Sequence, residues 1–271
     1  NIETLQYDDD LLKIFNIPKI MLPEVKNSSD YYGETNLFSC GPIKIMGVAG
    51  DQQSALLGHQ LIKKGGIKMT YGTGLFCLMN TGNNPVYSEK GLLTTIGLTT
   101  KNEKYYALEG SVFIGGAAVQ WLRDGLNLVE NAAETEEKAF FSKDESLIVV
   151  PAFAGLGTPY WDNECRGAIY GITRGTNKND IVKATLEGIA LQAYDVIKTM
   201  IDDTKIQLNY LSVDGGASSN NYLMQFQSDI VPTKIIRPEV VETTSLGAAF
   251  LVGITSGYFL DLERSEERRV G

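Results

Sequence analysis

The chain has 271 residues and a formal net charge of −9, so it is long enough for one large or two ordinary domains. Hydrophobic residues make up 43% and charged residues 21% of the chain, which is typical of globular proteins. The acidic balance, with no basic run to offset it, argues against nonspecific binding to nucleic acid or anionic membranes. No apolar stretch approaches the roughly 18 residues of a membrane span.

The cysteines and the single histidine limit the chemistry. Three cysteines, Cys40, Cys77 and Cys165, lie far apart and without CxxC spacing, so we predict no metal site and expect free thiols in a reducing compartment, the cytoplasm. His59 is the sole histidine, which argues against Ser–His–Asp chemistry and multi-histidine zinc sites. We predict that His59 lies on a helix surface and that a carboxylate performs any acid–base work.

The N-terminal segment indicates a fragment, because the chain starts at Asn1 in mid-pattern and without an initiator methionine. Residues 8–17 predict a short helix with an acidic cap, and Pro18 ends it. A short strand is predicted at residues 43–48. The residues of the first helix expected to face inward are Leu11, Leu12, Phe15 and Ile17.

The stretch GVAGDQQSALL at residues 47–57 places Asp51, followed by Gln52, at the start of a helix predicted over 52–62. Asp51 has two interpretations, which the stretch alone leaves open. It is a general base for a bound hydroxyl, or it is an N-cap that stabilises the helix by about 1 kcal/mol. The run Lys63-Lys64-Gly65-Gly66 is expected to end this helix, and its double glycine predicts a domain boundary.

Beyond that boundary the pattern changes to strands and then to alternating strands and helices. Strands are expected at residues 67–71, 75–79, 91–98, 104–109, 146–152, 208–213 and 233–237. Helices are expected after the turn at 110–116 and at 130–139, 179–200, 222–230 and 243–255. Residues 155–171 predict a loop, and the charged tail 262–271 is expected to be disordered. This order predicts an α/β domain with a mixed sheet.

Three glycine turns follow strands: Gly72-Thr73-Gly74, Gly115-Gly116 and Gly215-Gly216. A single such turn is most often only a tight turn. Several turns that open helices in one domain favour an anion ligand, since free backbone N–H groups there bind phosphate. The sequence holds neither GxxxxGK[ST] nor GxGxxG, which argues against a Walker ATPase and a dinucleotide binder.

A resemblance to a known family rests on five segments, which occur in the order GVAGDQQSALLG, MTYGTGLFCLMNTG, ALEGSVFIGGAAVQWLRDGL, PYWDNECRGAIYGITRGT and VDGGASSNNYLMQFQSDI. They resemble the glycerol kinases of the FGGY carbohydrate kinase family. The resemblance implies an actin-like, RNase H-like two-domain kinase that phosphorylates the terminal hydroxyl of glycerol with ATP and Mg²⁺. Residues 1–64 would be the remnant of the N-terminal, substrate-side domain. Residues 65–259 would be the C-terminal nucleotide-binding domain, and 260–271 a truncated or foreign tail.

The resemblance also assigns roles to single residues. Asp51 matches the family's catalytic base, Gln52 its neighbour on the glycerol hydroxyls, and Phe76 the aromatic against the glycerol carbons. The residues that match ATP or ADP contacts are Thr73, Gly116, Gln120, Gly216 and Asn220. No ligand role is assigned to three other residues: Asp214 is interpreted as a turn former ahead of Gly215-Gly216, and Trp121 and Trp161 as packing residues.

Parts of the family pattern are absent from this chain. The resemblance places the first phosphate loop, an aspartate that helps to hold Mg²⁺ and the glycerol-clamping residues before the segments present here, so we expect the fragment to be incomplete for catalysis. Pro42 stands where some bacterial members carry an arginine for an anionic regulator, and that regulation is not predicted. The resemblance also implies a homodimer or a homotetramer for the full-length protein. The alternatives are another FGGY sugar or pentulose kinase and, for the fragment, a nucleotide-binding module without turnover.

Overall fold

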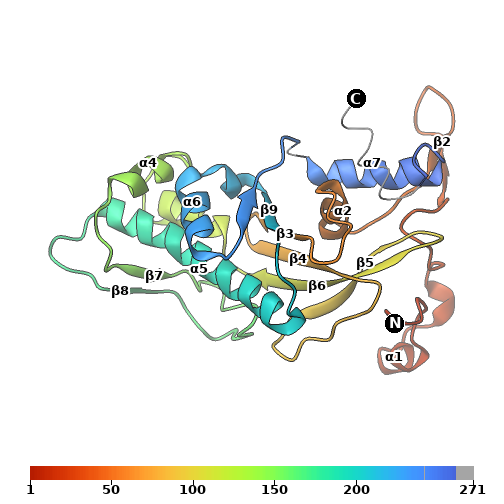
Figure 1. Cartoon of the computed structure of the whole chain (residues 1–271), viewed down its shortest axis with the longest axis horizontal. Coiled ribbons are helices and arrows are strands. Elements are labelled where there is room, and N and C mark those ends of the chain that lie inside the picture. Colours follow the sequence, from red (N-terminus) through yellow and green to blue (C-terminus); the bar gives the residue numbers. More distant parts are fainter. Residues whose placement is uncertain (241, 261–271) are drawn as a thin grey trace.

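The computed structural model describes residues 1–240 and 242–260, and the predicted disordered tail at 262–271 lies outside them. A six-stranded mixed sheet, in the order β10-β9-β3-β4-β6-β5, forms the centre of the molecule (Figure 1). β10, β9 and β3 are parallel, and β4, β6 and β5 continue the sheet antiparallel. The strands are β3 (Ile67–Tyr71), β4 (Leu75–Gly82), β5 (Leu93–Thr99), β6 (Lys104–Val112), β9 (Tyr210–Asp214) and β10 (Lys234–Ile236). The predicted α/β class with a mixed sheet is confirmed.

The alternation of side chains along β3 separates the two faces of the sheet. Ile67, Met69 and Tyr71 enter the main hydrophobic core, which lies between the sheet and α5 (Lys178–Thr204), α6 (Asn221–Ile230) and α4 (Glu134–Phe141). Lys68 and Thr70 therefore point to the other face, on which α2 (Asp51–Gly58) and α7 (Thr243–Thr255) pack.

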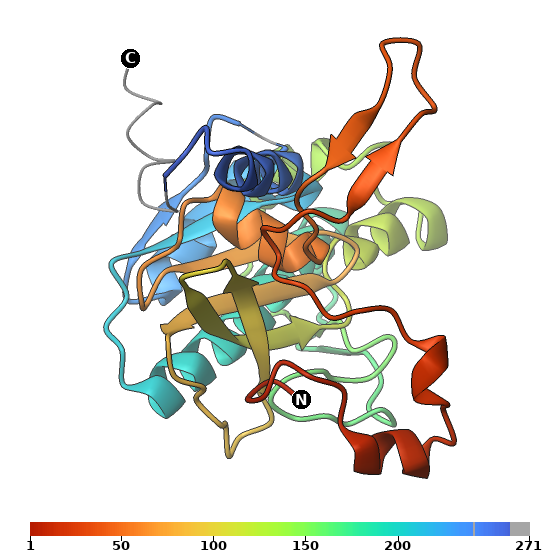
Figure 2. The ribbon, with the colours of Figure 1, turned by 90° about the vertical axis from the view of Figure 1, so that its right-hand side faces the viewer.

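Helices α2 and α7 cross at very short range, and Figure 2 shows them stacked on the same side of the sheet. A Cβ atom added to Gly58 would lie 1.9 Å from the carbonyl oxygen of Thr243, and one added to Gly247 would lie 1.8 Å from that of Ser54. Only glycine permits this approach. The Ser54 hydroxyl then donates to the carbonyl of Thr244 at 2.7 Å, which fixes α2 relative to α7.

Two predictions about α2 are wrong. Gly50 is the N-cap, while Asp51 is the first helical residue, with Oδ1 accepting the N–H of Gln52 at 2.8 Å. The helix also ends at Gly58, before the lysine–glycine run, because Gln60 adopts a left-handed φ of 60°.

The predicted surface position of His59 is wrong as well. His59 is 8% exposed, its Nε2 lies 2.9 Å from Asp214 Oδ2, and its Nδ1 lies 2.7 Å from Ser212 Oγ. Since a carboxylate only accepts, Nε2 carries the hydrogen of the contact with Asp214. Asp214, interpreted from sequence as a turn former, also accepts from the Thr243 hydroxyl at 2.6 Å. These buried polar groups join α2, β9 and the start of α7.

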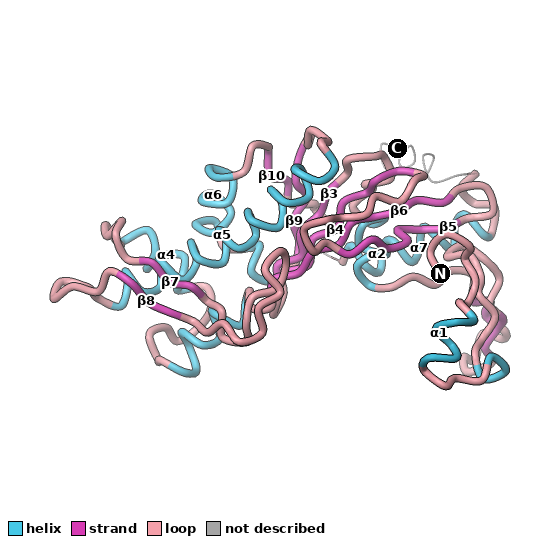
Figure 3. Tube along the Cα trace, turned by 90° about the horizontal axis from the view of Figure 1, so that it is seen from below, coloured by secondary structure: helices cyan, strands magenta, loops and turns pink. Residues whose placement is uncertain are grey.

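The N-terminal segment lies at the opposite end of the molecule from α4 (Figure 3). It holds α1 (Asp9–Ile14), the 3₁₀ turn Lys19–Met21 and the hairpin of β1 (Gly33–Thr35) and β2 (Ile43–Ile45). Asp8 caps α1. The expected inward face is wrong, because no residue of α1 is buried and Leu11, Phe15 and Ile17 are exposed. An apolar pattern predicts which face of a helix is apolar, but it does not show whether another part of the chain packs on that face.

The remaining elements follow β6. They are α3 (Gly116–Gln120), its π-helical extension Trp121–Gly125, and the antiparallel pair β7 (Ile148–Val150) and β8 (Ala168–Tyr170). Residues 155–171, expected to be loop, therefore contain a strand. Both tryptophans contact other residues of the chain: Trp121 lies 4.7 Å from Phe153 and Trp161 lies 6.1 Å from Phe113 between ring centroids, and the Trp161 indole also donates to the carbonyl of Gly91 at 2.6 Å. Cys40, Cys77 and Cys165 are free.

We predict that Gly247→Ala lowers the free energy of unfolding by about 2 kcal/mol or more, because the new methyl group overlaps backbone that can move only if α2 and α7 separate. Gly175→Ala is the control. Its Cβ would lie 3.7 Å from Thr173 Oγ1, so a change within about 0.5 kcal/mol is expected. Urea unfolding of both variants measures the difference, and equal stabilities would contradict the tight crossing.

A second prediction concerns pH. Burial raises the pKa of Asp214, but hydrogen bonds from His59, Thr243 and Thr70 and the charge of Lys68 outweigh it and hold that pKa below its ordinary value of 3.8. The stabilisation by ionised Asp214 is therefore complete above about pH 4 and is lost as the pH falls further. Asp214→Asn should be less stable than wild type at pH 5, and the difference should narrow near pH 3 as Asp214 of the wild type becomes protonated. Urea unfolding measures these free energies, and Asp229→Asn, at an exposed aspartate, is the control. If the stability difference between wild type and Asp214→Asn grew in acid, Asp214 would not have a lowered pKa.

Candidate functional site

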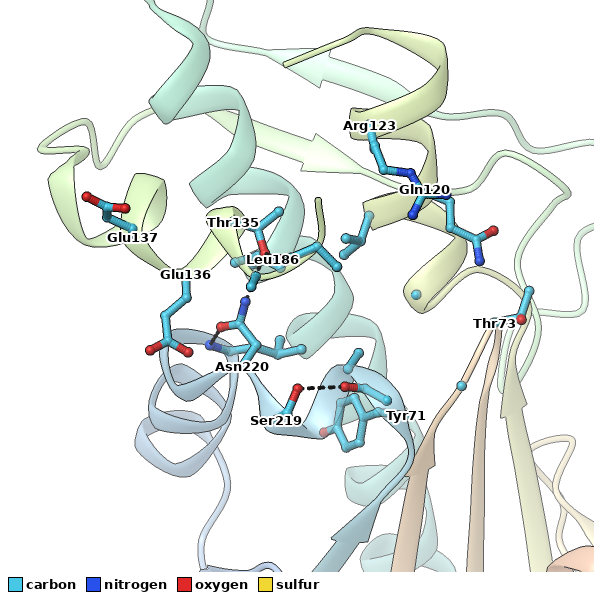
Figure 4. Close-up of a pocket in the computed structure, with 18 of the residues that line it drawn as sticks. Tyr71, Thr73, Gln120, Arg123, Thr135, Glu136, Glu137, Leu186, Ser219 and Asn220 are labelled. Carbon is cyan, nitrogen blue, oxygen red and sulfur yellow. Dashed lines mark hydrogen bonds between the residues drawn. The ribbon is translucent and has the colours of Figure 1, made fainter. Parts of the chain in front are cut away.

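A cavity of about 960 Å³ opens between the β3–β4 hairpin tip, α3, α4 and the start of α6 (Figure 4). Much of its wall is apolar, with contributions from Val119, Phe140, Leu186 and Leu223. Its lining includes all of the predicted nucleotide contacts, namely Thr73, Gly116, Gln120, Gly216 and Asn220. Residues that lie up to about 150 positions apart in the chain thus meet at one cavity.

The hairpin tip is fastened to the start of α3. The N–H of Gly116 donates to the carbonyl of Gly72 at 2.8 Å, and those of Gly115 and Ala117 donate to the carbonyl of Thr73 at 2.8 and 3.1 Å. A Cβ added to Gly116 would lie 2.8 Å from Gly72 O, so glycine is required there. These N–H groups are thereby used within the protein. The prediction that this turn offers them to an anion is wrong, and the exposed hairpin tip with the Thr73 hydroxyl remains on the cavity side.

The opposite wall begins where β9 ends. Gly215 has a φ of 85°, a conformation that side chains rarely adopt, and the chain then enters the 3₁₀ turn Gly216–Ser219. Gly216 is exposed, and a Cβ added to it would meet nothing within 4 Å. The turn therefore presents a bare backbone surface to the cavity.

Asn220 connects the two helices of this wall. Its Oδ1 accepts the N–H of Leu223 at 2.9 Å and so caps α6, while its Nδ2 donates to Thr135 Oγ1 of α4 at 3.0 Å. Asn220 thus shapes the cavity and keeps one amide hydrogen for a ligand.

Sequence reasoning missed the contribution of α4. Glu136 accepts from the backbone N–H of Asn221 at 2.5 Å and from its Nδ2 at 3.0 Å, which holds α4 against the start of α6. Phe140 and Phe141, exposed by 60% and 67%, also line the cavity. The sequence did offer one signal for this wall: Phe140 and Phe141 form an apolar pair at the end of a polar helix, and no core position was predicted for them.

Positive charge at the cavity is limited, since its lining, within the part of the chain that the structure describes, holds one cation beside Glu136 and Glu137. Arg123 is the cationic residue of the lining, and it is paired with Asp124 through bonds of 2.6 and 2.7 Å. Anion binding there would rest mainly on backbone N–H groups, hydroxyls and amides.

The predicted substrate residues lie on the other face of the sheet. Asp51 is exposed and Gln52 half-buried at the start of α2. Phe76 is 38% exposed and lies opposite Thr70 in the β3–β4 register, so it shares the face of Lys68 and Thr70. It is thus an accessible aromatic and not part of the buried core.

Lys68 lies beneath these residues and is fully buried. Its ammonium donates to Gln52 Oε1 and, at 2.7 Å, to Thr70 Oγ1. Burial lowers the pKa of Lys68 to about 8, against the opposing effect of nearby acidic groups that include Asp214, Asp51 and Glu109. Burial likewise raises the pKa of Glu109, which the charge of Lys68 opposes.

Two general searches of the described residues complete this survey. Within 1–240 and 242–260, no three or more His, Cys, Asp or Glu side chains gather in a way that could hold a metal ion. None of the helices in that part of the chain is both long and apolar enough to cross a bilayer.

Comparison with known proteins identifies a family. Residues 67–256 match the C-terminal domain of the FGGY family of carbohydrate kinases, and residues 1–58 match its N-terminal domain. Glycerol kinase of Lactococcus lactis is 54% identical over 270 residues, which cover 98% of this chain and 54% of that protein. Glycerol kinase of Pasteurella multocida is 53% identical over 271 residues, covering 99% of this chain and 54% of that protein.

Solved structures agree. The Plasmodium falciparum glycerol kinase with ADP superposes with a TM-score of 0.90 at 39% identity, covering 98% of this chain and 54% of that one. The xylulose kinase of Lactobacillus acidophilus, at 24% identity and a TM-score of 0.84, covers 98% of this chain and 55% of that one and supports the fold alone. The chain spans about half the length of the relatives it matches. It has the actin-like ATPase fold of these kinases and belongs to the FGGY family of carbohydrate kinases.

Proposed function

We propose that the intact protein transfers the γ-phosphoryl group of ATP to the terminal hydroxyl of glycerol, giving glycerol 3-phosphate and ADP. The observation that carries this proposal is the similarity to curated glycerol kinases at 53–54% identity over nearly the whole chain. The gathering of the predicted nucleotide residues at one cavity supports it. The cytoplasmic location and the homo-oligomeric state expected from the family remain predictions, as does the domain boundary at Gly65-Gly66.

The cavity suits a nucleotide. Its apolar wall between α4 and α6 would take the flat base, and the Thr73 hydroxyl at the hairpin tip would donate to the phosphate oxygens. Mg²⁺ would screen the negative charge of the phosphates during transfer.

Asp51 is the proposed general base. Phosphoryl transfer through a loose transition state requires mainly positioning and charge stabilisation. As the new O–P bond forms and the bond from the γ-phosphorus to the ADP oxygen breaks, the attacking hydroxyl loses its proton to the Asp51 carboxylate. Gln52 would bind a hydroxyl of glycerol, and Phe76 would pack against its carbons.

For the chain by itself we propose a narrower function, a nucleotide-binding module without turnover. The cavity is built entirely from residues of this chain, whereas Asp51 is exposed and none of the cavity residues belongs to the α2 face. Glycerol phosphorylation by these 271 residues alone would contradict this.

The catalytic proposal predicts that Asp51→Asn lowers kcat of the intact protein by about 10²–10⁴-fold, because the variant loses the proton acceptor. Asp10→Asn, which changes another exposed first-turn helix aspartate, is the matched control and should keep the wild-type rate. Coupled release of ADP with saturating ATP and glycerol measures both. If Asp51→Asn retained more than about a tenth of the rate, Asp51 would not be the general base. If the wild type preferred a pentulose to glycerol, the protein would be another FGGY kinase.

The nucleotide proposal predicts that Gly216→Leu abolishes ADP binding without unfolding the chain. Its side chain would start in open space at a residue that lines the cavity, where it would compete with the nucleotide for room. Gly175→Leu, at an exposed glycine outside the cavity, should bind ADP as the wild type does. Calorimetry with ADP decides: unchanged affinity in Gly216→Leu would place the nucleotide elsewhere.

A further inference from the structure

Lys68 is a buried cation that the proposed chemistry does not use. It sits in the second position of β3, opposite Ser212 of β9 and Leu78 of β4, with no exposed surface. Lysine rarely occupies such a position unless it is paired, since burial of a charge is costly. Its neighbours therefore indicate what it does.

The contact with Gln52 fixes which end of the amide faces outward. An ammonium group only donates, so the Gln52 atom that it contacts must be the carbonyl Oε1. The other end of the amide, Nε2, then keeps two hydrogens to donate. Among the bonds formed by residues 1–240 and 242–260, none uses this Nε2. Lys68 thus converts an amide that could present either end into an oriented donor.

The surrounding carboxylates explain why the cation is tolerated. Glu109 faces Leu78 across the sheet, which puts it on the same face as Lys68. Asp214, Asp51 and Glu109 all oppose the loss of the Lys68 proton that burial favours. The ammonium is thus balanced by groups on β9, α2 and β6 and keeps a fixed place beneath the start of α2.

We propose that Lys68 is a positioning residue for the acceptor substrate: it holds the Gln52 amide so that Nε2 donates to a substrate hydroxyl oxygen beside the one that loses its proton to Asp51. The proposal rests on the function proposed above. In this arrangement the α2 face binds a polyol through two adjacent residues, with Gln52 as the oriented donor and Asp51 as the acceptor. Lys68 itself does not contact the nucleotide.

The test uses two variants. Lys68→Met keeps a side chain of similar length but removes the hydrogen-bond donor, and Lys68→Gln keeps a donor without the charge. Lys234→Met, at an exposed strand lysine, is the matched control. The wild-type intact protein is first assayed with ATP and either glycerol or xylulose, and the variants are measured with whichever it prefers. Each variant is also tested for ADP binding by calorimetry.

The expected result is a rise of about 5- to 10-fold in KM for the polyol in Lys68→Met, the effect of losing the neutral hydrogen bond that the Gln52 amide donates to the polyol. KM for ATP and ADP affinity should stay unchanged, and Lys68→Gln should recover part of the loss. In a Gln52→Leu background, Lys68→Met should add less than about three-fold, because its effect passes through Gln52.

The other outcomes overturn one claim or both. A wild type inactive on both substrates refutes the proposed function and this inference with it. An active wild type whose Lys68→Met variant matches Lys234→Met refutes only the inference, and so does an effect that is additive with Gln52→Leu. If no Lys68 variant binds ADP, Lys68 serves the fold, and the positioning role is rejected.

Discussion

The alternation of side chains along the five residues of β3 is the constraint on which both parts of the site depend. Ile67, Met69 and Tyr71 enter the core beneath α5 and α6, so Lys68 and Thr70 must face α2. The strand then ends at the hairpin tip that borders the cavity proposed to bind the nucleotide. A shift of one residue in register would bury neither set correctly. The distance between the two parts of the site is therefore set by one rigid, central strand.

The position of Asp51 depends on a second constraint, the close crossing of α2 and α7. A helix of eight residues has little stability of its own, so its orientation must come from packing. Gly58 and Gly247 allow backbone contact, and the buried pair of His59 and Asp214 ties the same helix to β9. Asp51, the proposed proton acceptor, is thus the first residue of a helix whose C-terminal end is held by these contacts.

The sequence predicted the elements better than the contacts between them. The β3–β4 hairpin at Gly72-Thr73-Gly74, the longest helix and the small-residue helix at 243–255 were all predicted, since each depends on local periodicity and turn chemistry. His59 and Asp214 were misinterpreted because their partners lie about 150 positions apart in the chain. Lys68 gave no signal, for a lysine in an apolar strand is normally read as exposed. The α4 wall was missed because its partners also lie far away in the chain. Only the tertiary fold brings Glu136 and Phe140 to the same cavity as Asn220.

The central claim is that this chain holds the nucleotide in the cavity between α4 and α6 and presents Asp51 to the acceptor hydroxyl. A crystal structure of the intact protein with glycerol and a nonhydrolysable ATP analogue tests it most directly. The account predicts the base against the apolar wall at Phe140, the phosphates at Thr73, a glycerol hydroxyl on Asp51 and Gln52 Nε2 donating to its neighbour. A nucleotide bound outside this cavity, or glycerol beyond hydrogen-bond reach of Asp51, would contradict it.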